Sequence, residues 1–177
     1  MNNRFRISGK CAVLAFILVL CAASVSAQVV KVLPIDITKA LTEGTMHAVI
    51  EPVYAGDTLK AFDGNKFTAY ELTGTDTLRV TLFSPVPISV QKAKVYFWSG
   101  AAWTLEAADT VIDLDAKQGS YAMLVNNRST LGFSSDSINF TQKTAKVFRL
   151  RIKASSGSSI YLGEWSLEGA VTFTRIA

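Results

Sequence analysis

The sequence predicts an all-β protein, an antiparallel β-sandwich of jelly-roll type, and three observations support this fold class. Stretches rich in Val, Ile, Thr and aromatic residues recur along the chain, with turn residues between them. Apolar and charged residues alternate within these stretches, which is typical of strands with one face in water. Only the segment 37–44 (ITKALTEG) has the pattern of a helix, one or two turns long and ended by a glycine.

Five segments carry the strand pattern most clearly. They are 77–83 (TLRVTLF), 88–98 (ISVQKAKVYFW), 120–125 (SYAMLV), 145–154 (AKVFRLRIKA) and 159–169 (SIYLGEWSLEG). The alternation is strict from Arg149 to Lys153, where charged residues flank two apolar ones. Many short strands separated by regular turns predict a sandwich or barrel of antiparallel strands.

The first 27 residues have the pattern of a secretory signal peptide. Three basic residues precede an apolar run (11–23), and the small residues at 25–27 suit cleavage before Gln28. The apolar run is shorter than the ~20 residues that a membrane-spanning helix needs, so we expect no membrane span. We therefore expect a signal peptide at 1–27 and export to the periplasm, the cell surface or the medium.

Residues 28–177 are expected to form a single domain, since their length suits one hydrophobic core. Both cysteines, Cys11 and Cys21, lie in the leader, so no disulfide can stabilise the exported domain. An alternative is a lipoprotein signal that anchors the chain through Cys21, although Leu20 is larger than the residue that such signals favour there.

Charge and side-chain chemistry exclude two classes of function. Lys and Arg number 18 against 14 Asp and Glu, and three of the basic residues lie in the leader, so we expect no nucleic-acid partner. Catalytic groups are scarce: the one histidine, His47, has apolar neighbours. Asp113 and Asp115 share one face if their segment is extended, whereas paired glycosidase carboxylates usually come from separate strands. We therefore expect no enzymatic activity.

The stretch 61–70 (AFDGNKFTAY) has two interpretations. Asp-Gly between apolar residues is a turn signal, because glycine accepts a positive φ without steric cost. Asp63, Asn65 and Thr68 also place three oxygen-bearing side chains around one glycine, as half of a metal cage would. These ten residues alone leave both interpretations open.

The same stretch resembles the A-x-D-G-N-x-x-T-x-W segment of discoidin domains, also called coagulation factor 5/8 type C domains. The carbohydrate-binding modules of the galactose-binding-like fold (family 32 type) share this segment, and Tyr70 here stands in place of its Trp. Later features follow in the family's order: strand, Pro turn and strand at 78–98, AAWTLEA at 101–107, and a closing strand pair at 145–169. The resemblance covers roughly Thr45 to Gly169.

The resemblance implies a structural calcium ion and a sugar site. The metal ligands would be Asp63, Asn65, Thr68 and Glu164, completed by main-chain carbonyls. Sugar-binding members present an aromatic platform beside a polar side chain on loops, and the equivalents here would be Tyr70, Trp98 and Arg128.

Two functions follow as expectations. The first is a secreted, non-catalytic binding module that recognises carbohydrate on a cell surface or matrix. The alternative is a structural or adhesive surface protein that uses the same sandwich for contacts with protein partners.

Overall fold

The computed structural model describes residues 28–52, 57–73, 77–115, 121–155 and 159–174, so the expected signal peptide lies outside the described residues. Its contacts divide the chain into a main unit, Val32–Val171, and a second unit of Met1–Lys31 and Thr172–Ala177. The strands are β1 (Gln28–Pro34), β2 (His47–Glu51), β3 (Tyr70–Leu72), β4 (Thr77–Phe97), β5 (Ala101–Ala108), β6 (Ala122–Thr130), β7 (Ser134–Ala154) and β8 (Ile160–Thr174). The helical segments are α2 (Ile37–Thr42), the 3-10 turn η1 (Thr58–Ala61) and α3 (Val111–Asp115).

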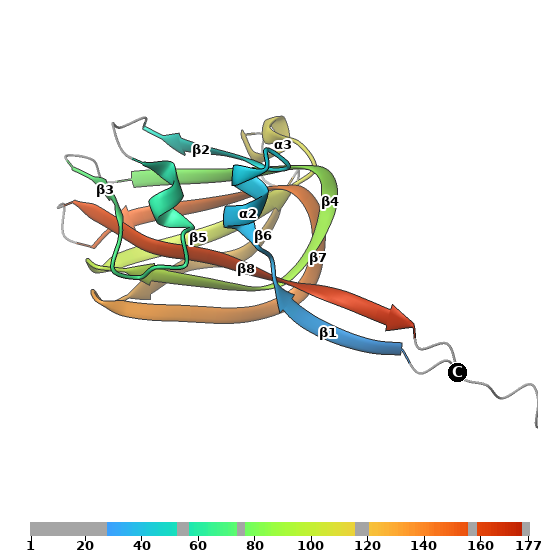
Figure 1. Cartoon of the computed structure of the whole chain (residues 1–177). Helices are drawn as coiled ribbons and strands as arrows, with labels where there is room; N and C mark the ends of the chain where they lie inside the picture. Colours follow the sequence, from blue (N-terminus) through green and yellow to red (C-terminus); the bar gives the residue numbers. More distant parts are fainter. Residues whose placement is uncertain (1–27, 53–56, 74–76, 116–120, 156–158, 175–177) are drawn as a thin grey trace, which may run out of the picture. The chain divides into compact units, whose positions relative to one another are not determined.

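Two long strands, β4 and β7, each take part in both layers of the main unit (Figure 1). Their pairing register breaks between Phe83 and Ile88. Two prolines lie in that interval, Pro85 and Pro87. Proline has no N–H to donate to a ladder, so a strand can bend there and leave its sheet.

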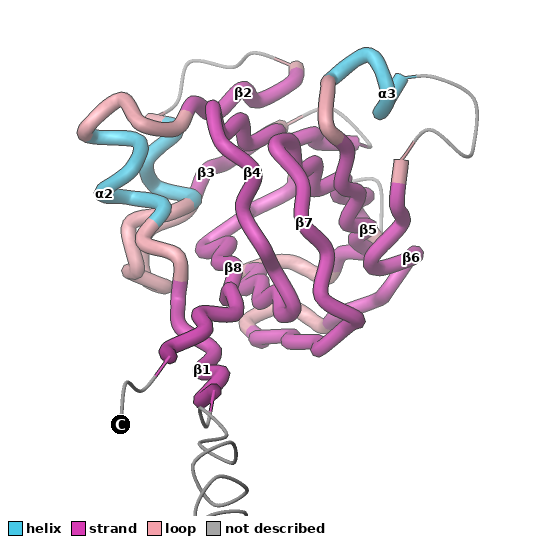
Figure 2. The backbone as a smooth tube through the Cα atoms, turned by 90° about the vertical axis from the view of Figure 1, so that its right-hand side faces the viewer, coloured by secondary structure: helices cyan, strands magenta, loops and turns pink. Residues whose placement is uncertain are grey.

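The result is an antiparallel β-sandwich, which confirms the predicted fold class. The first sheet has the order β2, β4 (77–83), β7 (147–153), β5 and β6. The second sheet has the order β7 (134–145), β4 (88–97), β8 and β3. All of these pairings are antiparallel, and Figure 2 shows β4 and β7 side by side.

The core lies between the two sheets. It is built from the alternate residues of each strand whose side chains point inward. Its largest fully buried side chains are Trp103, Trp165, Phe97, Phe148, Leu72, Leu78, Leu82, Leu105, Leu150, Ile152, Ile160 and Leu162. At roughly 25 cal/mol per Å² of buried apolar surface, this continuous core is the main source of stability for a domain that has no cysteine to cross-link.

The helical segments confirm one expectation and correct another. The predicted helix is present as α2, capped by the Asp36 carboxylate, which accepts from the Lys39 N–H at 2.9 Å. Gly44, with φ +70°, follows its end. The segment of Asp113 and Asp115, considered above as an extended strand, is instead α3.

The reason for α3 is local capping. The Thr110 hydroxyl accepts a hydrogen bond from the Asp113 N–H at 3.3 Å, as an N-cap residue does. The acidic side chain in the first turn also suits the positive end of a helix. In the described part of the chain, no helix has the length and apolar character needed to cross a membrane.

Candidate functional site

The turn at 63–68 is held together by its own side chains. The Asp63 carboxylate accepts from the Asn65 N–H at 2.8 Å and from the Thr68 hydroxyl at 2.6 Å. The Asn65 side-chain oxygen accepts from the Phe67 N–H at 3.1 Å. Gly64 has φ +72°, a conformation that glycine adopts without strain. Short polar side chains that bond to the backbone two residues ahead are typical of tight turns.

Glu164 contacts this turn although it lies 100 residues away in the sequence. It lies on β8, and its Oε2 accepts a hydrogen bond from the Gly64 N–H at 2.8 Å. The four side chains predicted to hold a metal therefore belong to one cluster, which we call the acidic turn (Asp63, Asn65, Thr68 and Glu164).

The electrostatics of the acidic turn favour a cation. Burial raises the pKa of the Glu164 carboxyl to about 7, and the charge of Asp63 acts in the same direction. The Gly64 N–H and the charge of Lys94 oppose these effects without cancelling them. The partly buried carboxylate of Glu164 and the exposed carboxylate of Asp63 repel each other, and a proton or a metal ion can relieve this repulsion.

The donor set of the acidic turn suits calcium better than a softer metal. Within the described ranges, no group of three or more His, Cys, Asp or Glu side chains could hold a metal ion. The acidic turn instead combines two carboxylates with amide and hydroxyl oxygens, the ligands that calcium prefers. The carboxylate oxygens that accept the hydrogen bonds of the turn keep further lone pairs for a metal.

Trp98 lies directly beside the acidic turn. Its indole Nε1 donates to the carbonyl of Lys66, inside the turn, at 2.9 Å. Its ring stacks with Tyr161, with centroids 6.2 Å apart, and with Phe133, at 6.5 Å. A Cβ at Gly163 would come within 3.1 Å of the indole nitrogen, so the absence of a side chain there leaves room for the ring.

The two turns that contact Trp98 each carry an exposed aromatic side chain. Phe67, in the turn at 63–68, is 78% exposed, and Phe133, in the turn between β6 and β7, is 75% exposed. Gly132 brings that second turn close, since a Cβ at this position would be 2.9 Å from the Trp98 carbonyl. We call Phe67, Trp98, Phe133 and Tyr161 the aromatic end. Exposed apolar groups gathered in one place are typical of interaction sites.

Three members of the aromatic end were not predicted from the sequence. Phe67 and Phe133 are apolar residues within turns, and that position was their only sequence signal. Tyr161 looked like an ordinary strand residue. Its hydroxyl donates to Glu71 at 2.8 Å, and this hydrogen bond raises the pKa of the tyrosine.

Tyr70 does not belong to the aromatic end. It is 2% exposed and lies opposite Leu162 in the pairing of β3 with β8. Its ring is part of the core, so it has no free face for a sugar.

Arg128 forms an ion pair with Asp136. Its guanidinium donates to both carboxylate oxygens of Asp136, with Nη2 to Oδ1 at 2.8 Å. This hydrogen bonding raises the pKa of Arg128 and lowers that of Asp136, which also accepts from the buried Trp103 indole at 3.0 Å. The pair connects β6 of the first sheet to β7 of the second, so Arg128 acts as a link between strands.

No protein-family model and no curated protein sequence matches the chain. Solved structures do match it. Chitosan-binding module 1 of a chitosanase/glucanase from Paenibacillus sp. IK-5 matches with a TM-score of 0.58 and 19% identity, over 71% of this chain and 96% of that one. The CBM32 of AlyQ in complex with 4,5-unsaturated mannuronic acid matches at 0.55 and 15%, over 68% and 92%. CpGH89CBM32-5 from Clostridium perfringens, in complex with GalNAc-β-1,3-galactose, matches at 0.56 and 13%, over 72% and 97%.

These matches define the class of fold. The chain has the galactose-binding-like sandwich of family 32 type carbohydrate-binding modules, which confirms the resemblance seen in the sequence. It spans nearly the whole length of each of these modules, and all three are binding modules rather than catalytic domains.

Proposed function

We propose that this protein is a secreted, non-catalytic module that binds carbohydrate through its aromatic end. The observation that carries this proposal is the stacking of the partly buried Trp98 with Tyr161 and with the exposed Phe133, next to a turn that carries the exposed Phe67. Aromatic faces offer large apolar contact area, and a sugar ring has apolar C–H faces that can lie against them. The solved modules of the same fold, with their chitosan, uronate and galactose ligands, support this ligand class.

We further propose that the acidic turn holds a structural calcium ion. Asp63 and Glu164 would supply the negative charges, and Asn65 and Thr68 would add neutral oxygens. A bound ion would neutralise the two carboxylates and fix the 63–68 turn. Because the Lys66 carbonyl in this turn accepts the Trp98 indole N–H, a fixed turn also fixes one edge of the aromatic end.

A glycan array with the domain from Gln28 to Ala177, followed by titration of the best glycan, tests the carbohydrate proposal. Phe133→Ala and Phe67→Ala should weaken binding at least about tenfold, since each removes an exposed ring from the site. Ile112→Ala is the matched control, because Ile112 is 80% exposed and lies on α3, away from the aromatic end. Equal affinity of all three variants and wild type would contradict the assignment.

The second candidate is a structural or adhesive surface protein that contacts protein partners. The same exposed rings favour it, because aromatic residues are enriched at protein interfaces. A glycan array without a reproducible hit, together with self-association or partner capture lost in Phe133→Ala, would select this candidate.

Export is proposed from the leader pattern. Intact-mass analysis of the protein recovered from outside the cytoplasm should give the mass of a chain that begins at Gln28. A diacylglyceryl mass on Cys21 would select the lipoprotein alternative instead.

A further inference from the structure

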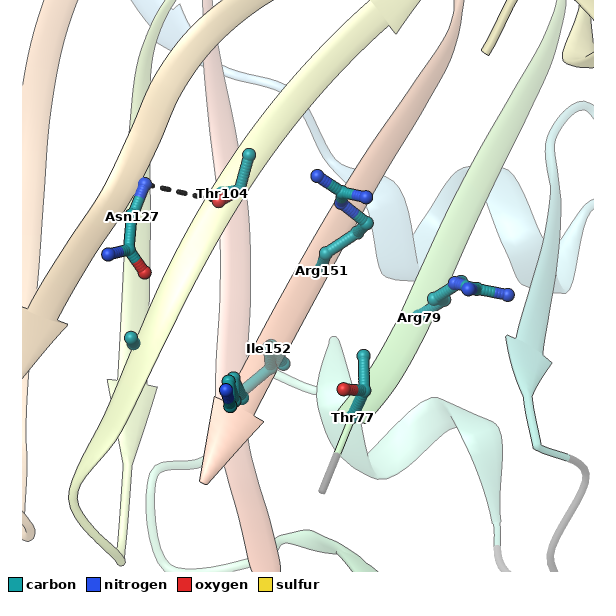
Figure 3. Close-up of a pocket in the computed structure, with 8 residues that line it drawn as sticks. Thr77, Arg79, Thr104, Asn127, Arg151 and Ile152 are labelled. Carbon is teal, nitrogen blue, oxygen red and sulfur yellow. Dashed lines mark hydrogen bonds between the residues drawn. The ribbon is translucent and has the colours of Figure 1, made fainter. Parts of the chain in front are cut away.

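The outer face of the first sheet contains a second candidate binding surface, distinct from the aromatic end. A hollow of about 300 Å³ lies across β4, β5, β6 and β7 (Figure 3). It is lined by Thr77, Arg79, Ala102, Thr104, Asn127, Arg151, Ile152 and Lys153. We call these residues the basic hollow. Along β4, Arg79 faces outward because its neighbours Leu78 and Val80 are fully buried in the core.

Three cations line the basic hollow, and no carboxylate does. Arg79 lies directly opposite Arg151 on the neighbouring strand, and Lys153 follows two residues later on the same face. Like charges opposite each other on paired strands destabilise a sheet. An arrangement of this kind therefore favours an anion that bridges the two strands.

Two of these cations have no partner among the described residues. In the described residues, neither the Arg79 nor the Lys153 side chain has a hydrogen bond or ion pair, and both are exposed. Glu51 of β2 is opposite Arg79 in the register, and it is also exposed, without an ion pair to Arg79. The charges of Arg79 and Lys153 are thus available to a ligand.

The third cation, Arg151, is held by a neighbouring carboxylate on the same face of the sheet. The Arg151 Nη2 lies 3.1 Å from Oε1 of Glu106, and the Glu106 side chain is 2% exposed. The Arg151 side chain itself remains 43% exposed. A guanidinium fixed on one side by a buried carboxylate keeps donors free on its other side, because the group carries five N–H donors.

Neutral polar groups complete the basic hollow. The Thr104 hydroxyl accepts from the Asn127 N–H at 3.1 Å, and the Asn127 side chain is exposed beside it (Figure 3). The Asn127 amide can donate to and accept from sugar hydroxyls. No aromatic side chain lines the hollow, so it offers no platform for stacking a nucleic-acid base or a neutral sugar.

We propose that the basic hollow binds an acidic polysaccharide, a chain of sugars that carry carboxylate or sulfate groups. Arg79, Arg151 and Lys153 would pair with acid groups, while Thr104 and Asn127 would contact hydroxyls. The open sheet face suits a linear polymer that crosses several strands. This surface is separate from the aromatic end, so the inference does not depend on the function proposed for that end.

The test is a titration of the domain from Gln28 to Ala177 with polygalacturonate, dextran sulfate and neutral dextran. We expect binding to at least one of the two polyanions and none to dextran. Binding should weaken as salt is added, because the attraction between charges is screened. A preference between polygalacturonate and dextran sulfate identifies the acid group.

The key variant is the double substitution Arg79→Ala with Lys153→Ala. Both side chains are exposed, so the fold should persist, and polyanion binding should weaken at least about tenfold. The matched control is Lys39→Ala with Lys60→Ala, which removes the same charge from α2 and η1. Phe133→Ala should also leave polyanion binding unchanged.

Several results would overturn the proposal. These are no binding to either polyanion at low salt, an equal loss of binding in the Lys39/Lys60 control, or unchanged binding in the Arg79/Lys153 variant. Equal affinity for duplex DNA or for anionic lipid vesicles would also overturn it, since the hollow would then respond to charge alone.

Discussion

Gly64 donates its backbone N–H to Oε2 of Glu164 across 2.8 Å, which joins an early turn to the last long strand. This single contact closes the acidic turn. It also places a half-buried carboxyl near Asp63, so the site holds more negative charge than its own hydrogen bonds neutralise. The contact therefore makes the stability of the domain depend on the protonation of Glu164, and the calcium proposal adds a dependence on metal.

Removal of either carboxylate should abolish stabilisation by calcium. For wild type, an ion at a hundredfold excess over its dissociation constant stabilises the fold by about 2.7 kcal/mol. Asp63→Ala and Glu164→Ala should each melt at the same temperature in calcium and in chelator. Thermal unfolding followed by circular dichroism measures this difference.

The control for this experiment is Asp109→Ala, because Asp109 is exposed and lies outside the acidic turn. Asp115 is unsuitable, since it forms a 2.8 Å ion pair with the buried Arg149. If wild type melts identically in calcium and in chelator, and the purified protein carries no metal, the calcium proposal is wrong.

Glu164 should also give the metal-free domain a distinctive pH dependence. Its pKa is about 7 in the fold against an ordinary value of 4.5, so the folded state binds the proton more tightly than the unfolded state does. A raised carboxyl pKa means that this group lowers stability progressively as pH rises from about 4.5 to about 7, and the loss persists above that range.

The measurement is the free energy of unfolding in chelator at several pH values, for wild type and Glu164→Gln. As the pH rises from about 4.5 to about 7, wild type should lose stability relative to Glu164→Gln. Excess calcium should remove this trend, because the metal stabilises the ionised carboxylate. Parallel pH profiles for the two proteins would contradict the raised pKa.

Five strand segments were predictable because their pattern is local, whereas β1, β2, β3 and the first half of β7 were not among them. Alternation from Arg149 to Lys153 places the charged residues on the outer face and Leu150 and Ile152 in the core, as the structure shows. The Pro turn inside β4 was also visible. The sequence did not reveal that β4 and β7 continue from one sheet into the other, because that depends on pairing between residues far apart in the chain.

The acidic turn was predictable for a similar reason, since Asp63, Asn65 and Thr68 form a local motif and Glu164 followed from the resemblance. The residues of the aromatic end were harder to predict. Tyr70 is buried by the pairing of β3 with β8, and the exposed Arg128 is paired with Asp136. Neither contact can be recognised from the local sequence. The aromatic end gathers side chains from separate turns and a strand, so only the tertiary structure shows it.

Gly163→Ala should displace Tyr96 or Trp98. An added Cβ would lie 2.8 Å from Tyr96 Cδ1 and 3.1 Å from the Trp98 indole nitrogen, so one of these rings must move. We expect a loss of stability of about 1–3 kcal/mol, the usual cost of overpacking. Tryptophan fluorescence should also report a more exposed indole, since Trp103 and Trp165 stay in the core.

Gly100→Ala is the matched control for that change. A Cβ there would meet its nearest atom, the Ser155 hydroxyl oxygen, at 3.4 Å, an ordinary contact distance. If Gly163→Ala and Gly100→Ala have the same stability and the same emission spectrum, Gly163 is not needed to seat Trp98.

Glu106→Ala should be the most destabilising single change on the outer face of the first sheet. Glu106 is 2% exposed and pairs with Arg151 at 3.1 Å, while Arg149 lies opposite it in the pairing of β5 with β7. Removal of one partner from a buried ion pair costs about 3–5 kcal/mol, because the remaining charge stays desolvated. Arg151 is partly exposed, so the cost should fall at the lower end of that range.

Glu106→Gln keeps an acceptor for the guanidinium and should cost less. Urea unfolding compares these variants with Lys39→Ala, which breaks the exposed Lys39–Glu43 pair on α2 and should cost less than about 1 kcal/mol. A Glu106→Ala variant as stable as Lys39→Ala would show that Glu106 does not hold Arg151 in the fold.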